Sequence, residues 1–414
     1  MPADMAVVRF LQIADLHLGA AFGWLPAEAR AERRREQRQA LELAVSQAIE
    51  RGAHAILIPG DLFDQEGVDA DSLAFALHAF KVAGCPPVFI TPGNHDPFTN
   101  ASVYWSPRIL KARGFAWPDH VHVFTSEGWS RRPLAGLDGV HVWGRCFTPS
   151  VESAERPLAT AALRETKSEA GAGLHVALFH GSREGRMPPG QKMVAPFSDA
   201  EAQAAPFAYM AAGHYHAASR LDVHDDRGGG TRLAYAGSAV ALAMGEIGMH
   251  GALEVRIERD GGKPFVEIDF VQLDDRSVHE IEADVTAAAG AEEVDRRIAG
   301  ALETAGVGAK DLATVRLRGR LLKGVRYAGP GADLAARLFH LRVDLRNVRP
   351  DYDLDAYRRT EPGTTEERFA RAILEKLDVE KNPRERAILE SALYYGLDAF
   401  RLREVVPGYE ELGQ

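Results

Sequence analysis

Residues 55–64 read AILIPGDLFD, an apolar run that ends on the pair Gly60-Asp61. Such a short, continuous apolar run, bounded by turn residues, predicts a buried strand. Four further apolar runs also end at Asp, Asn or His side chains, and they read VVRFLQI (7–13), VFI (88–90), LHVALF (174–179) and YMAA (209–212). Five strand ends therefore carry polar side chains, and sheet edges are where α/β folds place ligand sites.

Helical patterns separate the first three apolar runs. A helix of roughly 25 residues is predicted from apolar residues at helical spacing, and it carries Leu41, Ala44, Val45, Ala48 and Ile49. A second helix begins at Asp71. Strand, helix, strand, helix, strand is typical of a layered α/β core. Because many later strands follow without long helices, we expect two packed sheets flanked by helices.

The pattern changes near Asp274. Residues 278–285, 291–305 and 312–322 predict a strand, a helix and a strand, and residues 365–377 and 384–402 predict two charged helices. We therefore predict three domains, which are a core of residues 1–273, a small α/β cap of residues 274–349 and a helical C-terminal tail of residues 350–414.

Composition excludes several classes of protein. The chain has 414 residues, a net charge of −10 and two cysteines, so neither wholesale disorder nor a disulfide scaffold is expected. No apolar run is long enough to span a membrane, and the N-terminus lacks the layout of a signal peptide. We expect a cytoplasmic protein. The acidic balance argues mildly against nucleic acid as a partner.

The polar side chains at the strand ends form a metal-ligating pattern. Asp15 and His17 are two residues apart in an extended segment, so their side chains point the same way, and His214 and His216 repeat this spacing. Nitrogen and oxygen donors without thiolate suit Mn, Fe, Zn or Mg. Seven candidate ligands suit two ions that share a carboxylate, and they are Asp15, His17, Asp61, Asn94, His180, His214 and His216.

The series GDLFD, GNHD, HG and GH-x-H resembles the calcineurin-like metallophosphoesterases, and its form resembles their SbcD branch of DNA-repair nucleases. Residues 195–198 (APFS), residues 235–238 (YAGS) and the pair Glu246-x-Gly248 are most similar to the YhaO-type subgroup. The chain differs from the usual pattern at Tyr215 and Ala236, neither of which is a ligand. The resemblance implies a four-layer β-sandwich flanked by helices, followed by the α/β cap and the helical tail.

The resemblance also implies a role for each residue. Asp15, His17 and His216 would hold one metal ion, Asn94, His180 and His214 would hold the second, and Asp61 would bridge them. Manganese is the first expectation, with iron, zinc or magnesium as alternatives. The two ions would activate a hydroxide for attack on phosphorus. The catalytic residues would be His95, which protonates the leaving oxygen, and Asp96, which orients His95. Asp64 would support the metal ligands.

Three classes of function compete. The first is a DNA exonuclease or endonuclease of the SbcD-like type that works with an SbcC-like coiled-coil ATPase. The second is a phosphodiesterase or phosphatase for small molecules such as cyclic nucleotides. The third, a scaffold without catalysis, is disfavoured by the complete ligand set. The nuclease is favoured because about 140 residues follow the core, which is more than a lone catalytic domain requires. The sequence leaves open whether the chain forms a homodimer.

Basic residues supply candidate DNA contacts. Arg316, Arg318 and Arg320 alternate along a predicted strand and would share one face, and Arg183 and Arg186 follow His180 in a loop. A third basic cluster, on the first helix, is interspersed with Glu32 and Glu36 and predicts a salt-bridged solvent face, and it comprises Arg30, Arg33, Arg34, Arg35 and Arg38. With a net charge of −10, DNA binding by this chain alone is expected to be weak and salt-sensitive.

Overall fold

The computed structural model describes residues 7–64, 69–148, 155–164, 166, 173–188, 192–224, 229–260, 263–322 and 324–403. The chain forms two compact units. The first comprises residues 1–280, 307–314 and 336–341, and the second comprises residues 281–306, 315–335 and 342–414. The finer division at residues 273 and 349 stays a prediction.

The first unit is built on a sheet of twelve strands in the order β4-β3-β2-β1-β11-β12-β10-β8-β7-β6-β5, with β9 paired to β10. The strands are β1 (Val8–Gln12), β2 (Ala55–Pro59), β3 (Val88–Thr91), β4 (Val121–Val123), β5 (Ser130–Pro133), β6 (Val140–Gly144), β7 (Leu174–His180), β8 (Tyr209–Gly213), β9 (Ser219–Asp222), β10 (Gly229–Tyr235), β11 (Gly251–Asp260) and β12 (Lys263–Gln272). Its helices are α1 (Ala27–Glu50), α2 (Ala70–Ala79), α3 (Pro107–Ala112) and α5 (Asp199–Ala204).

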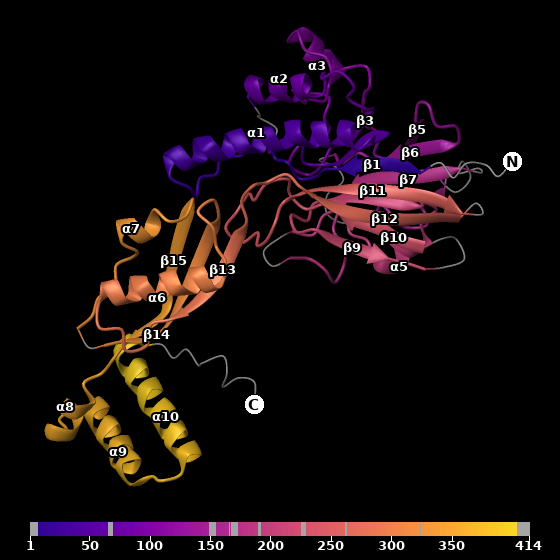
Figure 1. The fold of residues 1–414 in the computed structure, drawn as a ribbon. Helices are drawn as coiled ribbons and strands as arrows, with labels where there is room; N and C mark the ends of the chain where they lie inside the picture. Colours follow the sequence, from indigo (N-terminus) through magenta and orange to yellow (C-terminus); the bar gives the residue numbers. More distant parts are fainter. Residues whose placement is uncertain are drawn as a thin grey trace. The chain divides into compact units, whose positions relative to one another are not determined.

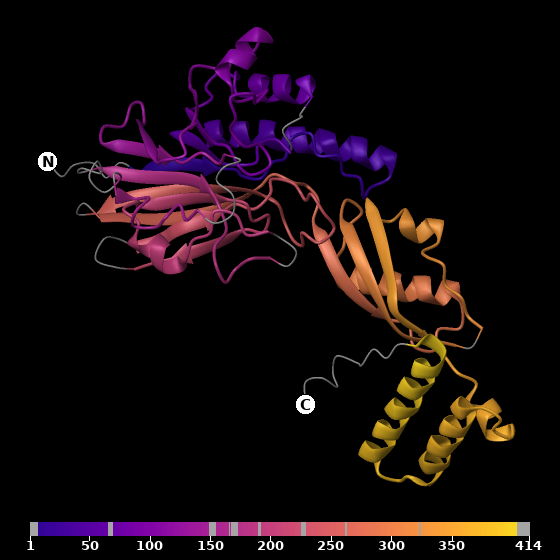
Figure 2. The same cartoon turned by 180° about the vertical axis from the view of Figure 1, so that it is seen from behind.

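The large sheet folds into two layers, which are joined where β10 and β12 pair over only two residues. Alternation along β2 shows the layering, because Ile56 and Ile58 enter the core that includes α1 and α2, whereas Leu57 enters the core between the two sheet layers. On β7, Leu178 enters that same middle core and Phe179 enters the core that includes α5. Figures 1 and 2 show α1 and α2 on one side of the sheet layers and α5 on the other. The predicted four-layer sandwich is confirmed.

Helix α1 carries polar as well as apolar residues into the first unit. Leu41 and Val45 are buried, as the helical periodicity predicts. The predicted salt-bridged solvent face is only partly right for Arg33, which pairs with Glu36 at 2.9 Å but has no exposed surface and also forms an ion pair with buried Asp274. Gln37, one turn further along, is also buried. Gln37 reaches the carbonyl of the predicted ligand His17, whereas Arg33 reaches the carbonyl of Ala241.

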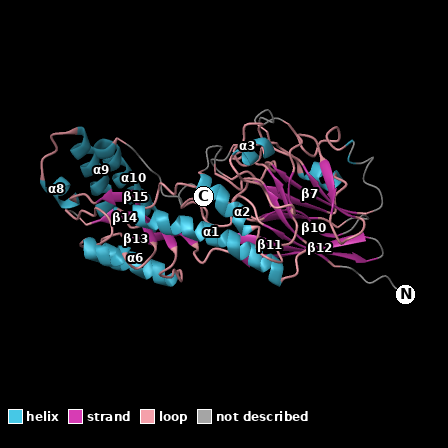
Figure 3. Ribbon diagram, turned by 90° about the horizontal axis from the view of Figure 1, so that it is seen from above, coloured by secondary structure: helices cyan, strands magenta, loops and turns pink. Residues whose placement is uncertain are grey.

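The second sheet has the order β13-β14-β15. The remaining elements are β13 (Val278–Asp284), α6 (Ala291–Thr304), β14 (Leu312–Leu321), α7 (Ala332–Ala335), β15 (His340–Pro350), α8 (Leu354–Arg359), α9 (Thr365–Val379) and α10 (Pro383–Leu402). Helix α6 lies alongside this sheet (Figures 2 and 3) and buries Val294, Ile298 and Leu302 at a spacing of four residues.

Helices α9 and α10 form the predicted helical tail. They pack through a core that includes Leu374, Leu393 and Leu397. Gly396 is required at their contact, because a Cβ atom there would lie 2.1 Å from the Phe369 ring. Among the described residues, each helix is too short or too polar to cross a membrane.

Candidate metal centre

Five strands of the first unit end at the predicted ligands. β1, β2 and β3 are parallel neighbours, and so are β7 and β8, so the carboxyl ends within each set lie at a common edge. His180 is the last residue of β7 and lies beside Gly213, the last residue of β8. The loops after β1 and β2 are tied together, because the amide of His17 donates to the carbonyl of Asp61 at 2.9 Å.

The backbone at this edge is strained. The φ angles of Asp15, His17 and Asp61 are 48°, 49° and 51°, and that of His214 is 111°. Positive φ is unfavourable for residues with a Cβ atom and persists only where the surroundings enforce it. Four predicted ligands adopt this conformation. The loops therefore accept an unfavourable backbone geometry that places these side chains at the centre.

One group of ligands gathers around His17. Ligand atoms of Asp15, His17 and His216 all lie within 4.8 Å of one another. The Nε2 atom of His17 is buried and makes no hydrogen bond to a described group. It faces Oδ2 of Asp61 at 3.6 Å, which is too long for a hydrogen bond. A buried imidazole nitrogen opposite a carboxylate at this separation fits a shared cation, so these residues suit a metal ion.

A second group lies on the other side of Asp61. Nε2 of His180 is 3.3 Å from Oδ2 of Asp61 and 2.8 Å from Oδ1 of Asn94. Nδ1 of His214 is 3.1 Å from the same Asn94 oxygen. All seven predicted ligands are therefore brought together, with Asp61 between the two groups. The arrangement suits two divalent metal ions.

The protonation equilibria fit a cation site. Burial raises the pKa of Asp15. Burial also opposes ionisation of Asp61, but the neighbouring His180 outweighs it and lowers the pKa of Asp61. Burial alone would lower the pKa of both His180 and His216, yet Asp61 raises that of His180 to about 9 and Glu246 raises that of His216 to about 9. Carboxylates at this centre thus favour positive charge on their neighbours, whether protons or metal ions supply it.

Residues beyond the seven hold the ligands in place. Nδ1 of His216 lies 2.7 Å from Oε1 of Glu246. Gln37 of α1 donates through Nε2 to the carbonyls of Leu16 and His17, both at 2.8 Å. Sequence reasoning quoted Glu246 without giving it a role and missed Gln37. The signal for Gln37 is a polar residue on the buried face of α1, which it shares with Arg33 and five apolar residues.

His95 lies at the exposed rim of the centre. Its side chain is 45% exposed, and its ring meets that of His17 edge-on at 4.6 Å between centroids. Nδ1 of His95 lies 2.8 Å from the carbonyl oxygen of Asp64. The carboxylate of Asp64 meets His17 at 3.1 Å, which matches the expectation that Asp64 supports a ligand.

Asp96 plays a different part from the predicted one. It is fully buried, and its carboxylate accepts the amides of Gly93 at 2.6 Å and Phe63 at 3.1 Å. The expectation that Asp96 orients the His95 ring is therefore wrong, because the Asp64 carbonyl holds that ring. Asp96 instead fixes the loop that carries Asn94.

Of the two arginines predicted to bind substrate after His180, Arg183 is already paired with a carboxylate. The guanidinium of Arg183 is buried, bonds both carboxylate oxygens of Asp199 at 2.5 and 2.8 Å, and donates to the carbonyl of Arg220. These contacts fix the loop after β7, and the role of Arg183 as a substrate ligand stays a prediction. Arg186, three residues on, is exposed.

The arginines of β14 belong to the second unit. Arg316 and Arg318 are exposed on one face of the strand, as the alternation predicts. Arg318 lies 3.9 Å from the carboxylate of Asp284. Arg320 is paired with Asp398 at 2.6 Å and lies over the ring of Tyr394, so its role in binding substrate stays a prediction. Arg320 anchors α10 to β14.

A four-layer α/β/β/α sandwich that collects carboxylates, an amide and imidazoles at the ends of its strands defines a metal-dependent phosphoesterase. The family model for the calcineurin-like phosphoesterases matches residues 8–217, which is half of the chain, and the chain belongs to this family. It is therefore a hydrolase that acts on phosphoester bonds.

Several solved structures are similar to the chain. The protein TT1561 of Thermus thermophilus is 15% identical, with a TM-score of 0.36 over 65% of this chain and 100% of that one. A dimetal phosphatase from Danio rerio is 13% identical, with a TM-score of 0.38 over 63% and 98%. Purple acid phosphatase PPD1 from yellow lupin seeds is 13% identical, with a TM-score of 0.39 over 66% and 53%. No curated protein sequence matches the chain.

Proposed function

We propose that the chain is a DNA phosphodiesterase of the SbcD-like type that acts in DNA repair, cleaving as an exonuclease or endonuclease with two manganese ions. The observation that carries the diester chemistry is His95, an exposed imidazole at the rim of the buried ligand set. Nitrogen and oxygen donors without thiolate support manganese. The free thiols Cys85 and Cys146 support a reducing, cytoplasmic location.

The position of each residue determines its proposed role in hydrolysis. Two divalent ions, held by the two ligand groups with Asp61 in common, would supply positive charge at the phosphate and an activated water. Since Nδ1 of His95 is engaged with the Asp64 carbonyl, Nε2 is the atom that would donate a proton to the leaving oxygen. Asp61 holds the His95 backbone by accepting its amide at 2.9 Å, and Asp96 fixes the same loop by accepting the Gly93 amide.

The substrate is tested by direct comparison. End-labelled duplex and single-stranded DNA, a cyclic nucleotide and bis(p-nitrophenyl) phosphate are each incubated with the protein and Mn²⁺. We expect hydrolysis of DNA as well as of the simple diester, and none after chelation. Hydrolysis of the small esters without any DNA cleavage would refute the nuclease proposal.

A small-molecule phosphodiesterase or phosphatase is the second candidate. It is favoured by the pairing of Arg183 with Asp199 and of Arg320 with Asp398, because both arginines are then unavailable to a DNA backbone. Arg316 and Arg318, whose side chains are exposed, support DNA instead. Replacing both with Glu should weaken DNA cleavage and leave the cyclic nucleotide unaffected.

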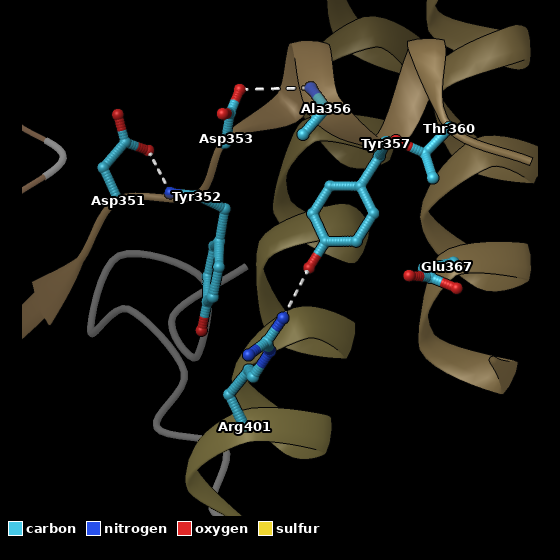
Figure 4. Close-up of a pocket in the computed structure, with 8 residues that line it drawn as sticks. All are labelled: Asp351, Tyr352, Asp353, Ala356, Tyr357, Thr360, Glu367 and Arg401. Atoms are coloured by element: carbon cyan, nitrogen blue, oxygen red, sulfur yellow. Dashed lines mark hydrogen bonds between the residues drawn. The ribbon is translucent and has the colours of Figure 1, made fainter. Parts of the chain in front are cut away.

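We propose that the helical tail docks an SbcC-like coiled-coil ATPase. Ile388 and Phe400 of α10 are 53% and 43% exposed, which suits contact with a partner helix. A cavity of about 420 Å³ lies beside α8 and is lined by Tyr352, Tyr357 and Arg401, among others. Figure 4 shows the Tyr357 hydroxyl directed at Arg401. Loss of co-purification on Ile388→Glu would support this docking, and unchanged co-purification would refute it.

Whether the chain also forms a homodimer is tested by its mass in solution.

A further inference from the structure

The two ligand groups differ in what orients their histidines. In the group of Asp15, His17 and His216, both histidines meet a carboxylate on the ring nitrogen that faces away from the centre. Nδ1 of His216 lies 2.7 Å from Glu246, and Nδ1 of His17 lies 3.1 Å from Asp64. A carboxylate acceptor keeps the proton on Nδ1 and leaves the Nε2 electron pair free for the ion. It also makes Nε2 more basic, which strengthens its bond to the ion.

The other group is held by neutral acceptors. Nδ1 of His180 lies 3.0 Å from the carbonyl oxygen of Pro59, and Nε2 of His214 lies 2.9 Å from that of Lys192. Its third member, Asn94, is a neutral amide. Asp61 lies between the two groups, and Asp15 also lies within 4.8 Å of His180. What distinguishes the group around His17 is therefore the pair of carboxylates behind its histidines, Asp64 and Glu246, which the group around His180 lacks among the described contacts.

Glu246 is firmly fixed beneath His216. Its side chain is 15% exposed. The second oxygen, Oε2, accepts the Leu242 amide at 2.8 Å and the Ser238 hydroxyl at 3.0 Å. Ser238 in turn lies 3.0 Å from Nδ1 of His250. A carboxylate held by two donors on its far side is already oriented before an ion binds, which reduces the entropy lost on binding.

We propose that Glu246 is a positioning residue which, with Asp64, makes the Asp15, His17 and His216 group the high-affinity metal site. Two equivalents of the same divalent ion then bind in order, and the group that contains Asn94 is filled second. The inference rests on the two-metal centre of the proposed function and is independent of the substrate.

The test is a calorimetric titration of chelator-stripped protein with Mn²⁺ alone, with free Mn²⁺ counted by electron paramagnetic resonance. Wild-type protein should show two separable binding steps. Glu246→Gln should weaken the tighter step about 10–100-fold and spare the weaker one. Asp64→Asn should weaken the same step, and Asn94→Ala should remove the weaker step.

Glu254 offers a matched control. It is also a buried carboxylate, but it pairs with Arg51 at 2.6 Å and contacts none of the ligands. Glu254→Gln should retain both binding steps. Two equal steps in the wild type, or an equal loss of both steps in Glu246→Gln, would overturn the inference. Absence of any Mn²⁺ binding would overturn the two-metal centre as well, whereas ordered binding without DNA cleavage would leave this inference intact and refute the nuclease.

Discussion

Replacing Arg33 with methionine should strongly destabilise the first unit. Arg33 has no exposed surface, donates to both carboxylate oxygens of Asp274 and donates to the carbonyl of Ala241 at 3.1 Å. Removing one partner of a buried ion pair costs about 3–5 kcal/mol. Asp274 would still accept the amides of Ala241 and Arg276, at 3.2 and 3.0 Å. We therefore expect the lower end of that range, about 3 kcal/mol.

The assay is thermal unfolding followed by circular dichroism. At about 2–4 °C per kcal/mol, the midpoint of Arg33→Met should fall by roughly 6–12 °C. Adding Asp274→Asn removes the stranded charge, so the double variant should regain part of the loss. Arg34→Met, at the exposed neighbouring position, should stay within about 0.5 kcal/mol of the wild type. A midpoint for Arg33→Met as high as that for Arg34→Met, or two losses that simply add in the double variant, would contradict a stabilising buried ion pair.

Three further predictions address catalysis, pH and the tail. His95→Ala should retain both metal ions by elemental analysis yet lose about 10²–10⁴-fold in turnover of bis(p-nitrophenyl) phosphate, and unchanged turnover would contradict its role. Arg156 lowers the pKa of Glu201 from 4.5 to about 2, so their pair stabilises the fold above pH 4.5 and the stabilisation is lost as the pH falls toward 2. Melting temperatures of Glu201→Gln and wild type should therefore converge on acidification, and a gap that stays constant would exclude the linkage. Leu374→Ala, at a position only 2% exposed, should destabilise the tail by about 2–5 kcal/mol in urea unfolding, and a loss below about 1 kcal/mol would mean that α9 and α10 do not share a packed core.

The ligand set could be predicted because its signal is local. Each ligand lies within four residues of the end of an apolar run, and parallel strands bring such ends to one edge. The layering could also be predicted, since alternating residues such as Ile56 and Leu57 face different cores. In both cases a few consecutive residues carry the information.

The supporting contacts could not be predicted, because their partners are distant in the sequence. Asp274 lies 241 residues from Arg33. Glu246 lies 30 residues from His216. The charge of Arg183 suggested a phosphate contact, but whether an arginine meets substrate or a carboxylate depends on which loop packs beside it. Local pattern thus predicts where chemistry is placed but not what holds it there.

The strain at the centre explains why these buried polar contacts exist. Four ligands with positive φ cost about 1–3 kcal/mol each, a total comparable to the net stability of a domain. The ligand loops would relax unless other bonds opposed them. Gln37 holds the carbonyl of His17, Asp96 holds the loop of Asn94, and Arg33 with Asp274 holds the segment that leads to Glu246. An apolar side chain at any of these positions could fill the same volume, but it offers no hydrogen bond and could not hold a strained loop in place.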